Sequence, residues 1–129
     1  MKKTVLTMSV LAGNFGVCRL DSGSEIPEWA LESDFYSITK TSDELSIVCP
    51  ESGVPENVVC ERGWKVLKVE GPLDFGLTGI LAGISAVLAE KKVSIFAVST
   101  YDTDYILVRK KDLKTAVEAL EEAGYVILR

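Results

Sequence analysis

The sequence contains no histidine among its 129 residues, and its cysteines are few: Cys18, Cys49 and Cys60. Without histidine, the Ser-His and Cys-His catalytic pairs are excluded, so an enzyme would have to rely on carboxylates, lysine or a bound metal. The cysteines form no C-x-x-C pair, and the usual zinc ligand sets are therefore absent. Their odd number favours reduced thiols and a cytoplasmic location.

Positive charge is also scarce, because 14 basic residues stand against 19 acidic ones, for a net charge of -5. This balance argues against a nucleic-acid partner, since phosphates must be neutralised by clustered Lys and Arg. No apolar run approaches the roughly 20 residues of a membrane span. The basic and then apolar start, Met1 to Gly13, resembles a secretion signal, but Thr4, Thr7 and Ser9 interrupt it, so we expect a first strand there.

What the sequence does contain is enough apolar material, 47% of the residues, for one domain or two very small ones. The clearest pattern lies in residues 62–129. Its expected elements are strand Trp64–Glu70, helix Phe75–Glu90, strand Val93–Thr100, strand Tyr105–Arg109, helix Leu113–Ala123 and strand Tyr125–Leu128. The order β-α-β-β-α-β predicts an α+β, ferredoxin-like unit, with an antiparallel sheet and both helices on one face.

Helix ends and close packing are also predicted in this half. Asp74 and Asp112 are the expected N-caps, and Gly124 is the expected residue after the second helix. Gly79 and Gly83 lie four residues apart, and both are placed inside the first helix, where each glycine costs roughly 1 kcal/mol relative to alanine. Close approach of a neighbouring element explains them better than direct contact with a ligand.

Residues 1–61 have comparable strands but weaker helices. Strands are expected at Thr4–Leu11, Phe15–Leu20, Phe35–Thr41 and Glu44–Cys49, with one or two helical turns at Ile26–Leu31. The first two strands suit a hairpin across Ala12 to Asn14. We infer a degenerate unit of the same kind, covered by the other half or by a second chain.

Two turns gather polar groups with no evident structural need, Gly71 to Leu77 and Thr100 to Asp104. The first lacks both the P-loop and the G-x-G-x-x-G motifs, so a nucleotide is not expected. Free amides near Phe75 to Leu77, at the start of a helix, suit a carboxylate instead. The ammonium group of an amino acid would need acceptors, which Asp102 and Asp104 could supply. Asp102 is better explained as an ordinary turn residue, whereas for Asp104 both interpretations stay open because aspartate is disfavoured in strands.

The segments Gly71-Pro72-Leu73-Asp74-Phe75-Gly76-Leu77-Thr78-Gly79-Ile80-Leu81 and Val93 to Val108 together resemble an ACT domain. The resemblance is closest to small bacterial ACT-domain proteins of unassigned function and to the CASTOR family of cytosolic arginine sensors. Ile26-Pro27-Glu28-Trp29-Ala30-Leu31 also resembles the N-terminal half of the bacterial proteins. The resemblance therefore implies two tandem ACT-like units, residues 1–61 and 62–129.

The resemblance further implies a regulatory module that holds an amino acid between paired ACT units. By position, the implied ligand-binding residues are Leu73, Asp74, Phe75, Gly76, Leu77 and Leu81 from the loop and helix, with Ser94, Ile95, Thr100, Tyr101 and Asp104 from the facing strand and turn. Asp104 matches an acidic position that holds ligand in the arginine sensors. Those sensors have a second acidic residue where this chain has Leu77, and a glycine where it has Asp74, so the resemblance does not fix arginine as the ligand.

Three classes of function are compatible with this sequence. The leading hypothesis is a non-catalytic sensor, a cytoplasmic homodimer that binds a small amino acid and acts on a protein partner, without cofactor, metal or catalytic residues. A dimerisation or scaffold module with an empty site is the alternative. The least favoured class is a small hydrolase of the acylphosphatase type, because the first loop has no Arg, Lys or Asn to bind an anion.

Overall fold

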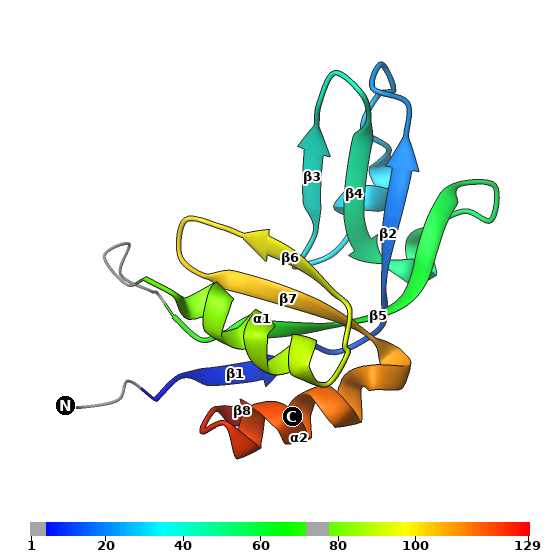
Figure 1. Cartoon of the computed structure of the whole chain (residues 1–129). Coiled ribbons are helices and arrows are strands. Elements are labelled where there is room, and N and C mark those ends of the chain that lie inside the picture. The colour runs from blue at the N-terminus through cyan, green and yellow to red at the C-terminus, as the bar shows by residue number, and fades with distance from the viewer. Residues whose placement is uncertain (1–4, 72–77) are drawn as a thin grey trace. The chain divides into compact units, whose positions relative to one another are not determined.

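The computed structural model describes residues 5–71 and 78–129 and shows a mixed α+β chain (Figure 1). The chain forms two compact units, one made of residues 1–12 with 65–129 and the other of residues 13–64. These limits differ from the expected 1–61 and 62–129, because the N-terminal strand pairs with strands of the second half. The segment 13–64 is therefore inserted into the larger unit.

The larger unit contains the predicted ferredoxin-like order with one additional strand. Its elements are β1 (Thr7–Val10), the second part of β5 (Val59–Val69), α1 (Ile80–Glu90), β6 (Ile95–Ser99), β7 (Asp104–Arg109), η3 (Lys110–Asp112), α2 (Leu113–Glu122) and β8 (Val126–Leu128). Within this unit the strand order is β8-β1-β5-β7-β6. β1 runs antiparallel to β5 and parallel to β8, with Met8 opposite both Val69 and Ile127.

The observed pairing of β1 shows that the predicted N-terminal hairpin is wrong. The sequence places this strand beside Phe15–Leu20, but its observed neighbours are β5 and β8. The physical reason is burial, since Met8 is fully buried among apolar residues of β5, β8 and the helices. β5 also exceeds its predicted length, beginning at Val59 rather than Trp64.

One apolar cluster joins the two helices to a single face of this sheet. Its buried members are Met8, Leu67, Val69, Ile84, Leu88, Val93, Ile106, Val108, Ala116, Val117, Leu120 and Ile127. Gly83 of α1 allows the close approach expected for it, because a Cβ there would lie 3.2 Å from the Tyr125 hydroxyl oxygen. The helix-covered face and its packing thus follow from the apolar periodicity of the sequence.

The smaller unit is an antiparallel sheet in the order β3-β4-β2-β5. It comprises β2 (Phe15–Leu20), η1 (Glu28–Leu31), β3 (Ser37–Lys40), β4 (Leu45–Pro50), η2 (Glu51–Gly53) and the first part of β5. β3 and β4, both predicted as strands, form a hairpin, with Thr41 Oγ1 accepting the backbone N–H groups of Asp43 and Glu44. The short helix expected at Ile26–Leu31 is a 3₁₀ helix that begins at Glu28.

The ends of α1 and α2 differ from the predictions in part. α1 begins at Ile80, with Gly79 as its N-cap at a φ of 75°. The helix therefore begins later than expected, and Phe75 and Asp74, its expected first residue and cap, lie outside the described residues. Gly79 precedes the helix as a turn residue, because its left-handed conformation favours glycine. Asp112 is the N-cap of α2 but makes no side-chain capping hydrogen bond, whereas Gly124 follows α2 as expected, at a φ of 103°.

Candidate functional site

The structure describes only some of the predicted site residues. Leu73, Asp74, Phe75, Gly76 and Leu77 lie outside the described residues, so their placement stays a prediction. The described members are Leu81 on α1, Ser94 and Ile95 at the start of β6, Thr100 and Tyr101 in the β6–β7 turn, and Asp104 at the start of β7.

The β6–β7 turn is fixed beside the end of β5. The Thr100 N–H donates to the Thr103 carbonyl at 2.8 Å, and the Thr103 N–H donates to Thr100 Oγ1 at 3.2 Å. The buried Thr103 hydroxyl donates to the Val69 carbonyl at 2.5 Å. Because Val69 ends β5 and Gly71 follows two residues later, Gly71, the first residue of the other turn singled out in the sequence, lies beside the β6–β7 turn. Thr103, which the sequence analysis did not assign to the site, makes this connection.

A small polar pocket lies at this junction. It has a volume of about 180 Å³ and is lined by Lys68, Gly71, Thr100, Asp102, Thr103 and Tyr105. Tyr101, by contrast, is 81% exposed at the tip of the turn. Among the described residues of the predicted site, Thr100 alone lines this pocket, which is a shallow polar recess, too small to enclose a typical ligand by itself.

Asp104 lies half-buried at the first position of β7. It is opposite Ser99 in the hairpin, and the Ser99 hydroxyl donates to its Oδ1 at 2.5 Å. Side chains alternate along a strand, so Asp104 shares its face with Ile106 and Val108, which pack under the helices. The carboxylate thus stands at the end of the helix-covered face, the side on which the first helix begins.

Ser94 and Ile95 lie at the opposite end of the hairpin from Asp104. Ile95 and Leu81 pack against the apolar core, and Ser94 is an exposed residue just before β6. Five residues of strand separate Ile95 from Thr100, which is roughly 17 Å at about 3.3 Å per residue. Ser94 and Thr100 of one chain therefore cannot contact the same small amino acid.

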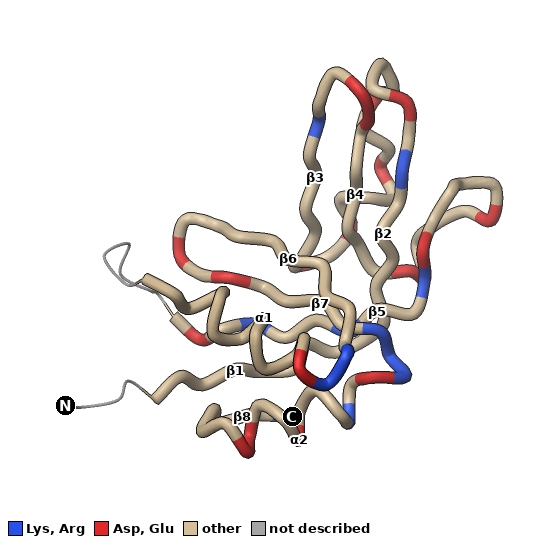
Figure 2. Tube along the Cα trace, in the orientation of Figure 1, with Lys and Arg blue, Asp and Glu red and all other residues tan. Residues whose placement is uncertain are grey.

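The hairpin is acidic. Between Ile95 and Val108 the sequence has two aspartates and no Lys or Arg. Figure 2 shows these acidic positions on the β6–β7 hairpin, away from the basic residues that follow β7. The charge of this segment suits a cationic group such as an ammonium or guanidinium.

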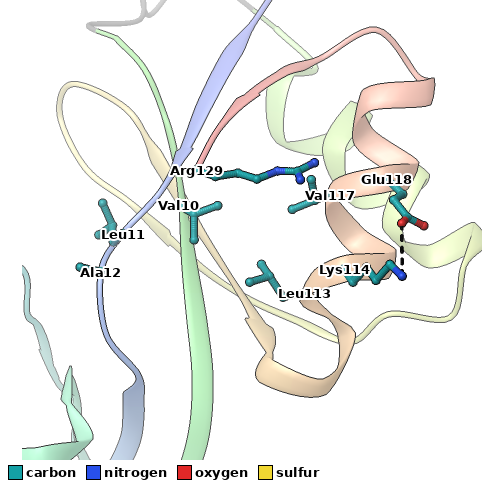
Figure 3. Close-up of a pocket in the computed structure, with 8 residues that line it drawn as sticks. All are labelled: Val10, Leu11, Ala12, Leu113, Lys114, Val117, Glu118 and Arg129. Carbon is teal, nitrogen blue, oxygen red and sulfur yellow. Dashed lines mark ion pairs between the residues drawn. The ribbon is translucent and has the colours of Figure 1, made fainter.

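A larger apolar pocket lies elsewhere in the same unit (Figure 3). Its volume is about 690 Å³, and its lining consists of Val10, Leu11, Ala12, Leu113, Lys114, Val117, Glu118 and Arg129. Arg129 extends from the end of β8 toward α2, where it donates to Glu121 Oε1 at 2.8 Å. None of the predicted site residues lines this pocket, which depends on the unexpected position of β1.

Over residues 5–71 and 78–129, no group of three or more Cys, Asp or Glu side chains is arranged to hold a metal ion. In the same part of the chain, no helix is long and apolar enough to cross a membrane.

Known proteins resemble both halves of the chain. The ACT domain family model matches residues 59–122, and a second model, described as an N-terminal domain, matches residues 13–57. Subunit 1 of the cytosolic arginine sensor for mTORC1 is 36% identical over 97 residues in Bos taurus and 34% identical over 99 residues in Homo sapiens. These matches cover 67% and 68% of this chain but only 30% of each relative.

Solved structures extend the similarity to nearly the whole chain. Protein Atu0741 from Agobacterium tumefaciens superposes with a TM-score of 0.92 and 39% identity, covering 98% of this chain and 94% of that one. Aspartate kinase from Clostridium acetobutylicum shares the fold, with a TM-score of 0.68 and 16% identity over 91% of this chain and 34% of the kinase. The expected ferredoxin-like fold is thus confirmed, and the chain belongs to the ACT domain family.

Proposed function

We propose that this chain is a cytoplasmic, non-catalytic regulatory module that binds a small amino acid between the ACT units of two copies and acts on a protein partner. Membership of the ACT domain family and the similarity to subunits named as arginine sensors support a sensing role. The observation that carries the proposal is the division of the predicted site residues between the two ends of β6. A site that uses both ends needs a second copy.

The free edge of β6 has the geometry to recruit that copy. Within the described part of the chain, β6 pairs only with β7. The hydrogen bond between Thr100 and Thr103 fixes the ladder, and hydrogen-bonded pairs alternate along an antiparallel hairpin. Ile95, Ala97 and Ser99 therefore direct their backbone N–H and C=O groups away from β7, toward the open edge.

Two such edges can pair around a twofold axis. With Ala97 opposite Ala97 of the second copy, all three outward-facing residues find partners, because Ile95 of each copy pairs with Ser99 of the other. This register satisfies more backbone groups than one shifted by two residues. It also places Ser94 of one copy opposite Thr100 of the other, which unites the two ends of the predicted site.

The chemistry of this junction suits an α-amino acid. Asp104 and the acidic hairpin would bind the ammonium group, and the loop containing Leu73 to Leu77 would meet the carboxylate. Arginine is the first ligand to test because of the relatives' names. Leu77 is neutral where the arginine sensors have an acidic residue. A smaller amino acid without a guanidinium group is therefore equally compatible with the site.

The experiment is a thermal melt of the purified protein with each common amino acid, arginine included, at millimolar concentration. A ligand at 100 times its dissociation constant adds about 2.7 kcal/mol, which raises Tm by several degrees. Asp104→Asn should abolish the response, since it removes the charge. The unliganded Tm should hardly change, because the asparagine oxygen can still accept the Ser99 hydrogen bond.

Two variants act as matched controls. Asp112→Asn removes the same charge at the start of α2, outside the proposed site, and should keep the response. Lys114→Glu changes the apolar pocket of Figure 3 and should also keep it. Loss of the response in Lys114→Glu alone would move the ligand to that pocket. If no amino acid raises Tm, the alternative of a dimerisation or scaffold module with an empty site replaces the sensor.

A further inference from the structure

The three cysteines meet in the core of the smaller unit. Cys18 on β2 and Cys60 on β5 are direct partners in the antiparallel ladder, and their Sγ atoms are 3.2 Å apart. Cys49 on β4 also hydrogen-bonds with Cys18. All three thiols are free. The sequence positions alone, with no C-x-x-C spacing, gave no indication of this cluster.

The strand register shows which of its two neighbouring cysteines, Cys60 or Cys49, Cys18 can bond with. Directly opposite residues have Cβ atoms about 4.5–5.5 Å apart, and a disulfide needs about 3.5–4.5 Å. Cys18 and Cys60 therefore need only a small movement to bond. Cys49 is opposite Gly16, so it is a diagonal neighbour of Cys18, at a Cα separation of about 7–8 Å that fits a disulfide poorly.

Gly16 helps to hold Cys60 in place. A Cβ at Gly16 would come within 2.5 Å of the Cys60 sulfur, so the thiol occupies the space that a side chain at this position would fill. The two thiols differ in exposure to solvent, and this difference decides which of them meets peroxide first. Cys18 is 1% exposed, whereas Cys60 is half-buried and is the thiol that a small solute can reach.

We propose that Cys18 and Cys60 form an oxidation site that closes a cross-strand disulfide when the protein meets a peroxide. The Cys60 thiolate attacks one peroxide oxygen, the O–O bond breaks, and hydroxide leaves, which gives a sulfenic acid. The Cys18 thiolate then attacks the Cys60 sulfur, the S–O bond breaks, and a second hydroxide leaves. The two thiol protons neutralise the hydroxides, so two thiols and one hydrogen peroxide yield one disulfide and two water molecules.

The surroundings of Cys60 make this reaction slow at neutral pH. Burial, followed by the hydrogen bond with Cys18, raises the pKa of Cys60 to about 12, with Glu51 adding to the rise and Arg62 opposing it. The pKa of Cys18 is raised as well, first by its hydrogen bond with Cys49 and then by burial. The same hydrogen bond lowers the pKa of Cys49, but this thiol is fully buried and shielded from peroxide.

The pH dependence of the rate of disulfide formation tests the proposal, because the direction of the change is defined. Only the thiolate of Cys60 attacks peroxide, and below its pKa the thiolate fraction rises tenfold per pH unit. With excess hydrogen peroxide, we expect the rate of bridge formation in the reduced, full-length protein to rise about tenfold per unit between pH 7 and pH 9. Quenching by alkylation in denaturant, followed by intact mass spectrometry, measures the bridged protein as the species that lacks two of the three alkyl groups carried by the reduced protein.

Peptide mapping without reduction identifies the bond. We expect one cross-link, between the peptides that contain Cys18 and Cys60, in the wild-type protein and in Cys49→Ser. Cys60→Ser should form no bridge. A wild-type bridge that includes Cys49, a sulfinic acid on Cys60 without a bridge, or no bridged species at pH 9 would each overturn the proposal.

Discussion

Lys92 and Gly124 occupy the same position in the C-terminal turns of the two helices. After α1, the N–H groups of Lys92 and Val93 donate to the carbonyls of Ala89 and Leu88 at 2.9 and 3.0 Å. After α2, Gly124 and Tyr125 make the equivalent bonds to Glu121 and Leu120, both at 3.0 Å. Both helices therefore end in a Schellman motif, with the left-handed residue glycine in one case and lysine, at a φ of 59°, in the other.

This comparison predicts that Lys92→Gly stabilises the protein. A side chain in the left-handed region costs about 1–2 kcal/mol, and glycine loses part of that gain through the entropy of its unfolded chain. We expect a net rise of about 0.5–1 kcal/mol in the free energy of unfolding, measured by urea denaturation. Gly124→Ala should lower it by about 1 kcal/mol.

Lys91→Gly is the matched control for this prediction. Lys91 has an ordinary φ of -91°, so glycine there should add only flexibility and lower the free energy of unfolding. Equal stabilisation by both lysine substitutions would show that lost charge, rather than backbone conformation, is responsible.

Individual residues also show where sequence reasoning succeeds. Gly124 is predictable because the signal for a helix end is local, a glycine after an apolar periodic segment. The role of Thr103 is not, because its hydroxyl bonds to Val69, a residue 34 positions away. The sequence also places Ser94 and Thr100 a strand's length apart, but it does not show whether the ligand lies within one chain or between two.

At the scale of elements, β6 is where the proposed assembly can be tested. Ala97→Pro removes a backbone N–H that points to the open edge, and it leaves every hydrogen bond to β7 in place. We expect this variant to sediment as a monomer in analytical ultracentrifugation at concentrations where the wild type is a dimer. Its Tm without ligand should fall by only a few degrees.

Ala97→Val is the control for the edge, because it keeps the N–H and favours a strand. It should sediment as the wild type does. If Ala97→Pro forms a dimer with the affinity of the wild type, the two copies do not pair through β6.

Elements were predicted well in type and less well in partners. The β-α-β-β-α-β order follows from local periodicity and is confirmed. β1 was predicted as a strand, but its pairing was assigned to the next strand along the chain, which is the commoner arrangement. The observed pairing depends on partners near Val69 and Ile127, and no local pattern reports such distant contacts.

The position of β1 has a consequence for the whole molecule. Among the residues that the structure describes, the helix-covered core comes from 8–10, 67–69 and the segment after Gly79, and none of it comes from 13–64. Met8 is fully buried and fills the space between β5 and β8. Removing this strand would open a gap in the middle of the sheet and would cost at least the 2–5 kcal/mol of a large core truncation.

We therefore predict that residues 62–129, the ACT unit expected from the sequence, do not fold cooperatively as an isolated fragment. The matched fragment joins residues 1–12 to 65–129 through a short Gly-rich turn. This joint is feasible because the Leu11 N–H donates to the Val66 carbonyl at 2.9 Å, which makes the two cut ends neighbours. The joined fragment should show a cooperative urea transition by far-UV circular dichroism, and the isolated one a gradual change. A cooperative transition at similar urea concentrations in both fragments would instead support a self-sufficient unit from residue 62, with β1 as an accessory strand.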